Sequence, residues 1–153
     1  MFQGKFVYSA WGELAEEVKE QKFTHIITLG SLLYGHQILD KVFEDMALCS
    51  TSETKIFIWD FARTAPDIGN ANIHLKLPYA IATKKKVLSA IDNSRLKLTD
   101  FEDFTRFILP GFKIISEESA KRDPKMEILK FELVREAFQE GKLAYIIYFC
   151  ELK

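Results

Sequence analysis

A group of residues near two predicted strand ends could bind a small ligand. In the stretch THIITLGSLLYGHQ, residues 24–37, an apolar run ends at Leu29 and is followed by Gly30 and Ser31. Ligands of parallel sheets bind beyond the carboxyl ends of the strands, where a glycine lets them approach the backbone and a serine can donate to an anion. The candidate ligand-binding residues here and at the end of the next apolar run are Gly30, Ser31, Tyr34, His36, Asp60 and Arg63.

The glycines of this stretch do not complete a known phosphate-binding motif. Gly30 and Gly35 are five positions apart, whereas the dinucleotide fingerprint is G-x-G-x-x-G and the P-loop has a lysine after its second glycine. His36 stands at that lysine position, and Leu32 and Leu33 make the loop apolar. The pattern favours a turn that carries core leucines, with ligand binding as the alternative.

Asp60 and Arg63 form the acidic and basic candidates at the end of the run KIFIWDF, residues 55–61. A carboxylate and a guanidinium at a strand end could hold a polar ligand. The same two residues could equally form a surface ion pair, which contributes less than about 1 kcal/mol. We favour an ion pair or a loop anchor over a ligand site.

The histidines do not predict a metal site. His36 lies near a predicted helix start, which would keep it neutral and able to act as a base. His25 lies inside an apolar strand and is expected to be structural. His25, His36 and His74 have no spacing of the H-x-x-x-H kind, so we predict no metal and no cofactor.

Lys84, Lys85 and Lys86 form the only basic run, a candidate anion patch. If Thr83 caps a helix there, the lysines occupy its first turn, where the helix dipole disfavours them. A run of lysines is more often a solvated face. The chain carries 21 basic and 22 acidic residues, a formal net charge of −1, so we do not expect nucleic acid as a partner.

Composition predicts one globular domain over residues 1–153, because 48% of the residues are hydrophobic and can form a core without metals or disulfides. Cys49 and Cys150 fit neither a disulfide framework nor a zinc site and favour a reducing compartment. The first 20 residues contain several glutamates and no signal-peptide pattern, and no apolar run is long enough for a membrane span. We therefore expect a cytoplasmic protein with no membrane contact.

Strands and helices are expected to alternate along the first half of the chain. Apolar residues at helical spacing mark the helices, and short β-branched runs mark the strands. The expected elements are a strand at 2–8, a helix at 9–21, a strand at 23–29, a helix at 35–48 and a strand at 55–61.

The second half is less regular. Thr99 and Glu102 have the spacing of a capping box, which predicts a helix that stops before Pro110. The other expected elements are a loop at 64–72, a strand at 73–77, a short helix at 83–91, a strand at 112–116, a helix from 123 to about 140 and a strand at 143–149.

The closing run LAYIIYF, residues 143–149, is apolar on both faces, which predicts a central strand. Together with the β-α-β-α-β start, it predicts an α/β (or α+β) fold of two or three layers around a partly parallel sheet.

Short fragments of the chain are similar to the barstar family of small ribonuclease inhibitors and occur in the same order. The resemblance implies binding to another protein, and it transfers no functional residue to this chain. The fragments are Tyr34-Gly35, Leu39-Asp40, a strand bearing Trp59, Arg135-Glu136-Ala137, Glu140-Gly141 and a strand around Ile146-Ile147.

No metal spacing, phosphate loop or nucleophile–base signature stands out in the sequence. We therefore predict a non-enzymatic binding or regulatory protein, inhibitor- or immunity-like, whose partner is another protein; the oligomeric state stays open. The alternative is a small-molecule or nucleotide-processing α/β enzyme with a crevice at the strand ends near residues 30 and 60. A third reading is nucleic-acid binding through the basic residues between Lys84 and Lys97.

Overall fold

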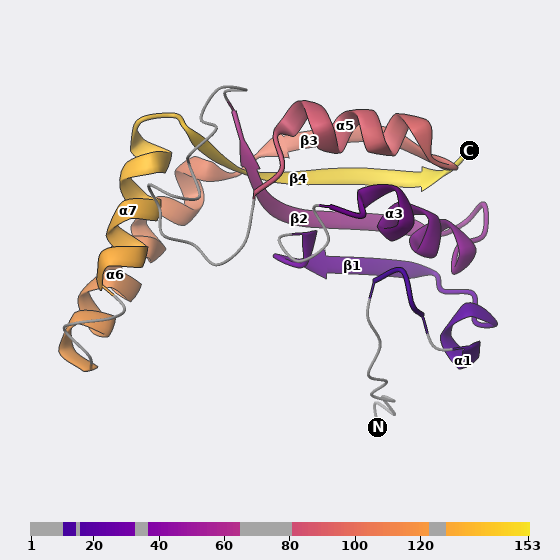
Figure 1. The fold of residues 1–153 in the computed structure, drawn as a ribbon, viewed down its shortest axis with the longest axis horizontal. Coiled ribbons are helices and arrows are strands. Elements are labelled where there is room, and N and C mark those ends of the chain that lie inside the picture. The colour runs from indigo at the N-terminus through magenta and orange to yellow at the C-terminus, as the bar shows by residue number, and fades with distance from the viewer. Residues whose placement is uncertain (1–10, 15, 33–36, 65–80, 123–127) are drawn as a thin grey trace.

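A mixed sheet of four strands organises the fold (Figure 1). The structure is a computed structural model that describes residues 11–14, 16–32, 37–64, 81–122 and 128–153. The strands are β1 (His25–Leu29), β2 (Lys55–Arg63), β3 (Leu96–Asp103) and β4 (Leu143–Leu152), in the spatial order β1-β2-β4-β3.

The strand directions confirm the predicted α/β class with a partly parallel sheet. β1 runs parallel to β2, whereas β4 runs antiparallel to both β2 and β3. β4 lies between β2 and β3, so the predicted central position of the closing strand is confirmed. Its burial on both faces explains why the run LAYIIYF carries no polar alternation.

Two helices cover one face of the sheet (Figure 1). They are α3 (Leu39–Leu48) and α5 (Lys84–Asn93), and their buried stripes include Phe43 and Ile91. These side chains form the main core with residues of the facing strands such as Ile58. α1 (Glu16–Lys19) is a short helix that precedes β1.

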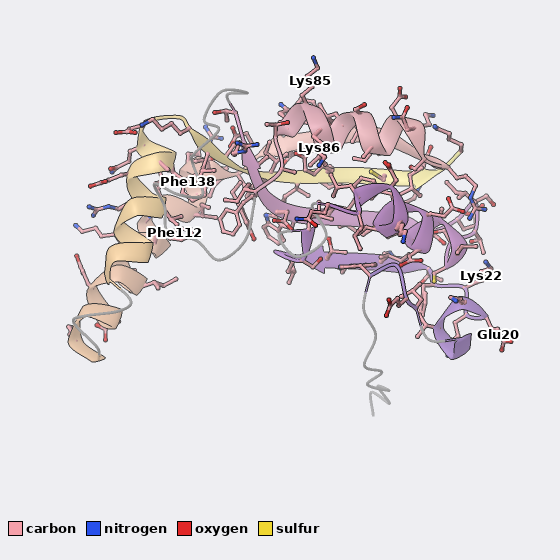
Figure 2. All side chains as sticks on the ribbon, in the orientation of Figure 1. Glu20, Lys22, Lys85, Lys86, Phe112 and Phe138 are labelled. Atoms are coloured by element: carbon pink, nitrogen blue, oxygen red, sulfur yellow. The ribbon has the colours of Figure 1, made fainter. Side chains whose placement is uncertain are left out.

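The remaining helices pair with each other at one end of the sheet (Figure 1). α6 (Thr105–Arg122) packs along α7 (Ile128–Gln139). Phe112 and Phe138 point toward one another from these two helices (Figure 2), with ring centroids 5.5 Å apart. Phe138 also lies 5.7 Å from the ring of Phe61 on β2, so this second core joins the helix pair to the sheet face opposite α3 and α5.

The structure corrects the prediction for residues 99–116. Residues 99–103 belong to strand β3, and the helix begins only at Thr105. The capping-box pattern was overridden because this segment pairs with β4, Phe101 with Tyr148 and Asp103 with Ile146. The predicted strand at 112–116 is also wrong, since α6 continues through Pro110 to Arg122.

The other predicted elements agree with the structure to differing degrees. Thr83 caps α5 as expected, and Gly141 follows α7 with a φ of 67°, as expected for a helix stop. Of the helix expected at 9–21, the described residues show only α1. The strand at 2–8, the strand at 73–77, most of the loop at 64–72 and the helix start at 123–127 lie outside the described residues.

Both cysteines are free and buried. Burial raises the pKa of the Cys49 thiol, and it raises the pKa of Cys150 to about 12. Within the described ranges, none of the helices has the length and apolar character that crossing a membrane requires.

Candidate functional site

The turn that follows β1 is tied to the end of β2. Gly30 takes a left-handed conformation with a φ of 63°, which glycine adopts without strain. Its backbone N–H donates to the carbonyl oxygen of Trp59 at 2.7 Å. Two residues later, the Leu32 N–H donates to the carboxylate of Asp60 at 2.6 Å. The carboxyl ends of the two parallel strands are therefore held as one unit.

Asp60 is the anchor of this turn. Its side chain is only 1% exposed and points to the face covered by α3 and α5. It accepts a second hydrogen bond from the Phe61 N–H at 2.7 Å. Burial raises the pKa of Asp60 to about 6, although the bonds from Leu32 and Phe61 act in the opposite direction.

Arg63 does not join Asp60. Side chains alternate along a strand, so residues 60 and 63 of β2 point to opposite faces. Arg63 Nε donates to the carbonyl oxygen of Ile81 at 2.7 Å, and the Arg63 N–H donates to the carbonyl oxygen of Ala82. Arg63 thus holds the segment that leads into α5.

Among the described residues, three buried hydroxyl groups near this turn have no hydrogen-bond partner: Ser31 Oγ, Thr28 Oγ1 and Tyr148 Oη. Burial, followed by the negative charges of Asp60 and Cys150, raises the pKa of Tyr148 well above its usual range. Buried polar groups nearly always have a partner, so each of these hydroxyls could bind a polar ligand or an ordered water. A Cβ placed on Gly30 would meet no atom of the described residues within 4 Å, so this part of the structure leaves open space beside the turn.

The basic run lies at the same end of the sheet. Thr83 pairs with Arg63 in a parallel bridge, which places the start of α5 at the carboxyl end of β2. Thr83 Oγ1 accepts from the Lys86 N–H at 3.1 Å. Lys84 Nζ lies 3.7 Å from the ring centroid of Phe101, and Lys85 points away from the sheet (Figure 2). A groove of about 370 Å³ between α3 and α5 is lined by Gln37, Leu39, Asp40, Thr83, Lys85, Lys86, Ser89, Ala90 and Asn93.

The structure thus brings together part of the candidate set. Gly30, Ser31 and Asp60 meet at the ends of β1 and β2, and Arg63 lies on the other face. Tyr34 and His36 lie outside the described residues. No cluster of His, Cys, Asp and Glu that could hold a metal occurs in the part of the chain that the structure describes. Thr28 and Tyr148 were not among the residues singled out from the sequence, although a polar atom in an otherwise apolar strand was a signal for both.

Solved structures that share this fold include a methyltransferase and cyclopropane synthases, and two of them contain S-adenosylhomocysteine. The chain superposes with a TM-score of 0.70 and 14% identity on geranyl diphosphate C-methyltransferase from Streptomyces coelicolor A3(2), solved with Mg²⁺, geranyl diphosphate and S-adenosyl-L-homocysteine; the match covers 85% of this chain and 47% of that one. Mycolic acid cyclopropane synthase CmaA1, solved with S-adenosylhomocysteine, gives a TM-score of 0.75 at 11% identity over 86% of this chain and 56% of that one. Cyclopropane synthase MmaA2 from Mycobacterium tuberculosis gives 0.68 at 11% identity, with the same two coverages.

These likenesses establish a fold, shared over most of the chain. The chain spans about half the length of the solved structures that it matches. No protein-family model matches the sequence, and no curated protein matches it significantly.

The comparisons correct our functional interpretation of the sequence. The prediction of a non-enzymatic, inhibitor- or immunity-like regulatory protein acting through protein–protein contact is wrong, because the neighbours of this fold are small-molecule enzymes. Our inclination to exclude an enzyme, which the absence of catalytic motifs had suggested, is wrong for the same reason. The error arose because we searched for complete motifs, whereas the ends of neighbouring strands bring together residues that are far apart in the sequence, such as Ser31 and Asp60. The alternative reading, a small-molecule enzyme with a crevice at the strand ends, is the one the comparisons favour.

Proposed function

We propose that the chain forms part of a methyl-transferring enzyme that uses S-adenosylmethionine and acts on a small molecule. One observation carries the proposal: the chain superposes over 85–86% of its length on a methyltransferase and on cyclopropane synthases, with TM-scores of 0.68 to 0.75. The substrates of those enzymes belong to them, and we assign none of them to this chain.

The ligand site of this proposal lies beyond the carboxyl ends of β1 and β2. Open α/β sheets bind ligands there, and the turn at Gly30 has open space beside it. The Ser31 hydroxyl has no hydrogen-bond partner among the described residues, so it could hydrogen-bond a polar ligand such as a nucleoside if the turn shifts to admit one. S-adenosylmethionine would supply an electrophilic methyl group. The residues of this chain would bind and orient it: Asp60 fixes the turn, and Ser31 offers a hydrogen bond.

Calorimetric titration of the purified chain with S-adenosylmethionine and S-adenosylhomocysteine tests the proposal. We expect saturable binding of both compounds. Replacing Ser31 by Ala should weaken binding by about 2- to 10-fold, the equivalent of one hydrogen bond. It should not lower the free energy of unfolding, because the described structure gives that buried hydroxyl no partner to lose.

Ser94→Ala is the matched control for this titration. The Ser94 hydroxyl donates to the Ile91 carbonyl and accepts from the Leu96 N–H, at the far end of α5. This variant should lose stability and keep its affinity for the ligand. Absence of binding, or equal affinities for wild type and Ser31→Ala, would contradict the proposed site.

A cytoplasmic location also belongs to this proposal. Cys49 and Cys150 are both free thiols, as in proteins of reducing compartments. Fractionation of cells that express the full-length protein would check the location, and recovery from an oxidising compartment would contradict it.

A further inference from the structure

β1 is an edge strand of the described sheet (Figure 1), but its sequence is that of an inner strand. The run HIITL contains no lysine, arginine, acidic residue or proline. Ile27 and Leu29 are each 63% exposed among the described residues. Natural edge strands usually carry lysines, other charges or bulges, because an apolar, uncharged edge pairs readily with a further strand.

The opposite edge of the sheet has these protective features. β3 carries Lys97, Asp100, Glu102 and Asp103 within eight residues. Its register with β4 also shifts between Leu98 and Asp100, as at a β-bulge. Of the two edges of the described sheet, β1 is therefore the one whose composition calls for another strand beside it.

The backbone groups of β1 point alternately toward β2 and away from it. The Gly30 N–H donates to the Trp59 carbonyl oxygen at 2.7 Å, and the Lys55 N–H donates to the Thr24 carbonyl oxygen at 3.0 Å. The even-numbered residues from 24 to 30 therefore face β2. The N–H and C=O groups on the other side have no partner strand in the described sheet, and they belong to His25, Ile27 and Leu29.

The segment that leads into β1 crosses the face of the sheet that α3 covers. Trp11 packs against the core that α3 and α5 form with the strands. The Gly12 N–H donates to the carboxylate of Asp45 on α3 at 2.6 Å. At the other end of the segment, the Phe23 N–H donates to the Cys49 carbonyl oxygen at 3.0 Å. The segment before β1 and the helix after it therefore lie on one face.

Handedness then fixes the side from which the chain enters β1. Connections between parallel strands of one sheet are nearly always right-handed. α3 carries the chain from β1 to β2 across this face. A connection of the same hand that enters β1 across the same face must start from a strand on the side of β1 away from β2. The sequence predicts a strand directly before this connection, FQGKFVY at residues 2–8.

We propose that residues 2–8 pair in parallel with the outer side of β1 and add a further strand to the sheet. Lys5, in the middle of this run, gives the new edge the charge that β1 lacks. The run ends three residues before Trp11, so its effective concentration at β1 is of millimolar order, as for short flexible linkers. A second copy of the chain would compete with it only at similar protein concentrations.

Amide hydrogen exchange of the isotope-labelled full chain, followed by NMR, tests the added strand. We expect the Ile27 N–H, which points away from β2, to exchange as slowly as the Thr28 N–H, which points toward it. Nuclear Overhauser contacts between β1 and residues 2–8 should be present in the wild type. Fast exchange of the Ile27 N–H beside a protected Thr28 N–H would overturn the proposal.

Two double variants of the run provide the matched comparison. Backbone groups alternate along a strand, so Lys5→Pro combined with Phe6→Pro must remove one N–H that points to β1. This variant should raise the exchange rate of the Ile27 N–H to that of an unprotected amide. Lys5→Thr combined with Phe6→Tyr removes the same charge with residues that favour strands, and it should keep the slow exchange.

The Thr28 N–H should stay protected in both variants, which shows that the rest of the sheet is intact. Slow exchange of the Ile27 N–H in the proline variant would mean that something other than residues 2–8 covers the edge, and the proposal would be wrong. Protection of Ile27 that rises with protein concentration would identify a second copy as the occupant and would contradict the proposal equally.

The added strand also bears on the proposed ligand site, and this step alone rests on the proposed function. β1 leads directly into the turn at Gly30 and Ser31, so a strand on its second side would hold that turn more firmly. The double proline variant should bind S-adenosylmethionine several-fold more weakly than the matched control. Equal affinities would refute this step. A wild type that binds none, with a protected Ile27 N–H, would refute the proposed function and leave the added strand standing.

Discussion

At the scale of single residues, Asp60 links the sheet to the candidate site. Its carboxylate is buried, yet it receives backbone N–H groups from Leu32 and from Phe61. A carboxylate in this position fixes the loop after a neighbouring strand through backbone hydrogen bonds. Its protonation state should therefore affect the stability of the fold, and through the turn the shape of the site.

The pKa of Asp60 predicts how stability depends on pH. Burial raises this pKa from 3.8 to about 6 in the folded protein. Between these values the folded state binds a proton more readily than the unfolded state, so stability increases as the pH falls from 7 to 5. The full effect is about 3 kcal/mol, of which about 1 kcal/mol develops in that interval. Urea denaturation at several pH values measures it.

Asp60→Asn provides the reference for this measurement, because the amide does not titrate. The difference in unfolding free energy between wild type and variant should change by about 1 kcal/mol between pH 7 and pH 5. The contributions of the histidines and the other carboxyl groups are common to both proteins and cancel in this difference. A difference that stays constant over this interval would show that Asp60 is ionised with an ordinary pKa.

At the scale of elements, the sequence predicted the helices and strands that have a clear local periodicity of apolar residues. The strands now seen as β1, β2 and β4 and the helices α3 and α5 were all expected, with ends differing by a few residues. The prediction of a helix at residues 99–103 was wrong because pairing with β4 prevailed over a good local helix start. The turn at Gly30 was predicted, but its attachment to Asp60 was not, because the pattern gives no register between two strands.

Pro110 and Gly111 show why the end of the predicted helix was misplaced. Both residues usually stop helices, yet α6 contains them near its first turns. Pro110 is the sixth residue of α6, so the only intrahelical bond that it removes is the one from its own nitrogen to the Arg106 carbonyl, and Gly111 lowers helix stability without breaking the helix. The loss of helix stability is therefore confined to this part of α6, and a substitution at Gly111 can recover part of it.

Gly111→Ala should stabilise the protein by about 1 kcal/mol, the difference in helix propensity between the two residues. The new methyl group would meet no atom within 4 Å, so no clash opposes the gain. Denaturation midpoints in urea, compared at equal slopes, measure the change.

Gly141→Ala is the control of opposite sign. A Cβ there would also meet nothing within 4 Å, but the residue has a φ of 67°. Alanine in that conformation costs about 1–2 kcal/mol, so this variant should be less stable than wild type. If both substitutions stabilised the protein, backbone conformation would not be what determines the effect of alanine at these two positions.

At the scale of the whole molecule, two hydrophobic cores lie on opposite faces of one sheet. The larger core is formed by α3 and α5 with one face, and the smaller core fastens α6 and α7 to the other. Phe43 is fully buried in the first, and Phe138 is 4% exposed in the second. Since α6 and α7 contact the sheet mainly through the smaller core, their stability should be separable from that of the rest.

Phe138→Ala should loosen α6 and α7 before the remainder of the fold. Removing a buried phenylalanine costs about 3–5 kcal/mol, and here that loss falls on the smaller core. Hydrogen exchange followed by mass spectrometry should show faster exchange in α6 and α7, with α3 and α5 changed much less. Phe43→Ala should give the reverse pattern. Equal acceleration everywhere in both variants would show that the two cores unfold as one unit.

The position of β4 has a consequence for synthesis on the ribosome. β3 is translated well before β4, yet its only neighbour in the described sheet is β4. When the nascent chain has emerged only as far as β3, the strand with which β3 pairs has not yet been synthesised, so β3 remains unpaired. Assembly of this half of the sheet thus waits for residues 143–152, and until then the growing polypeptide exposes strand edges that chaperones recognise.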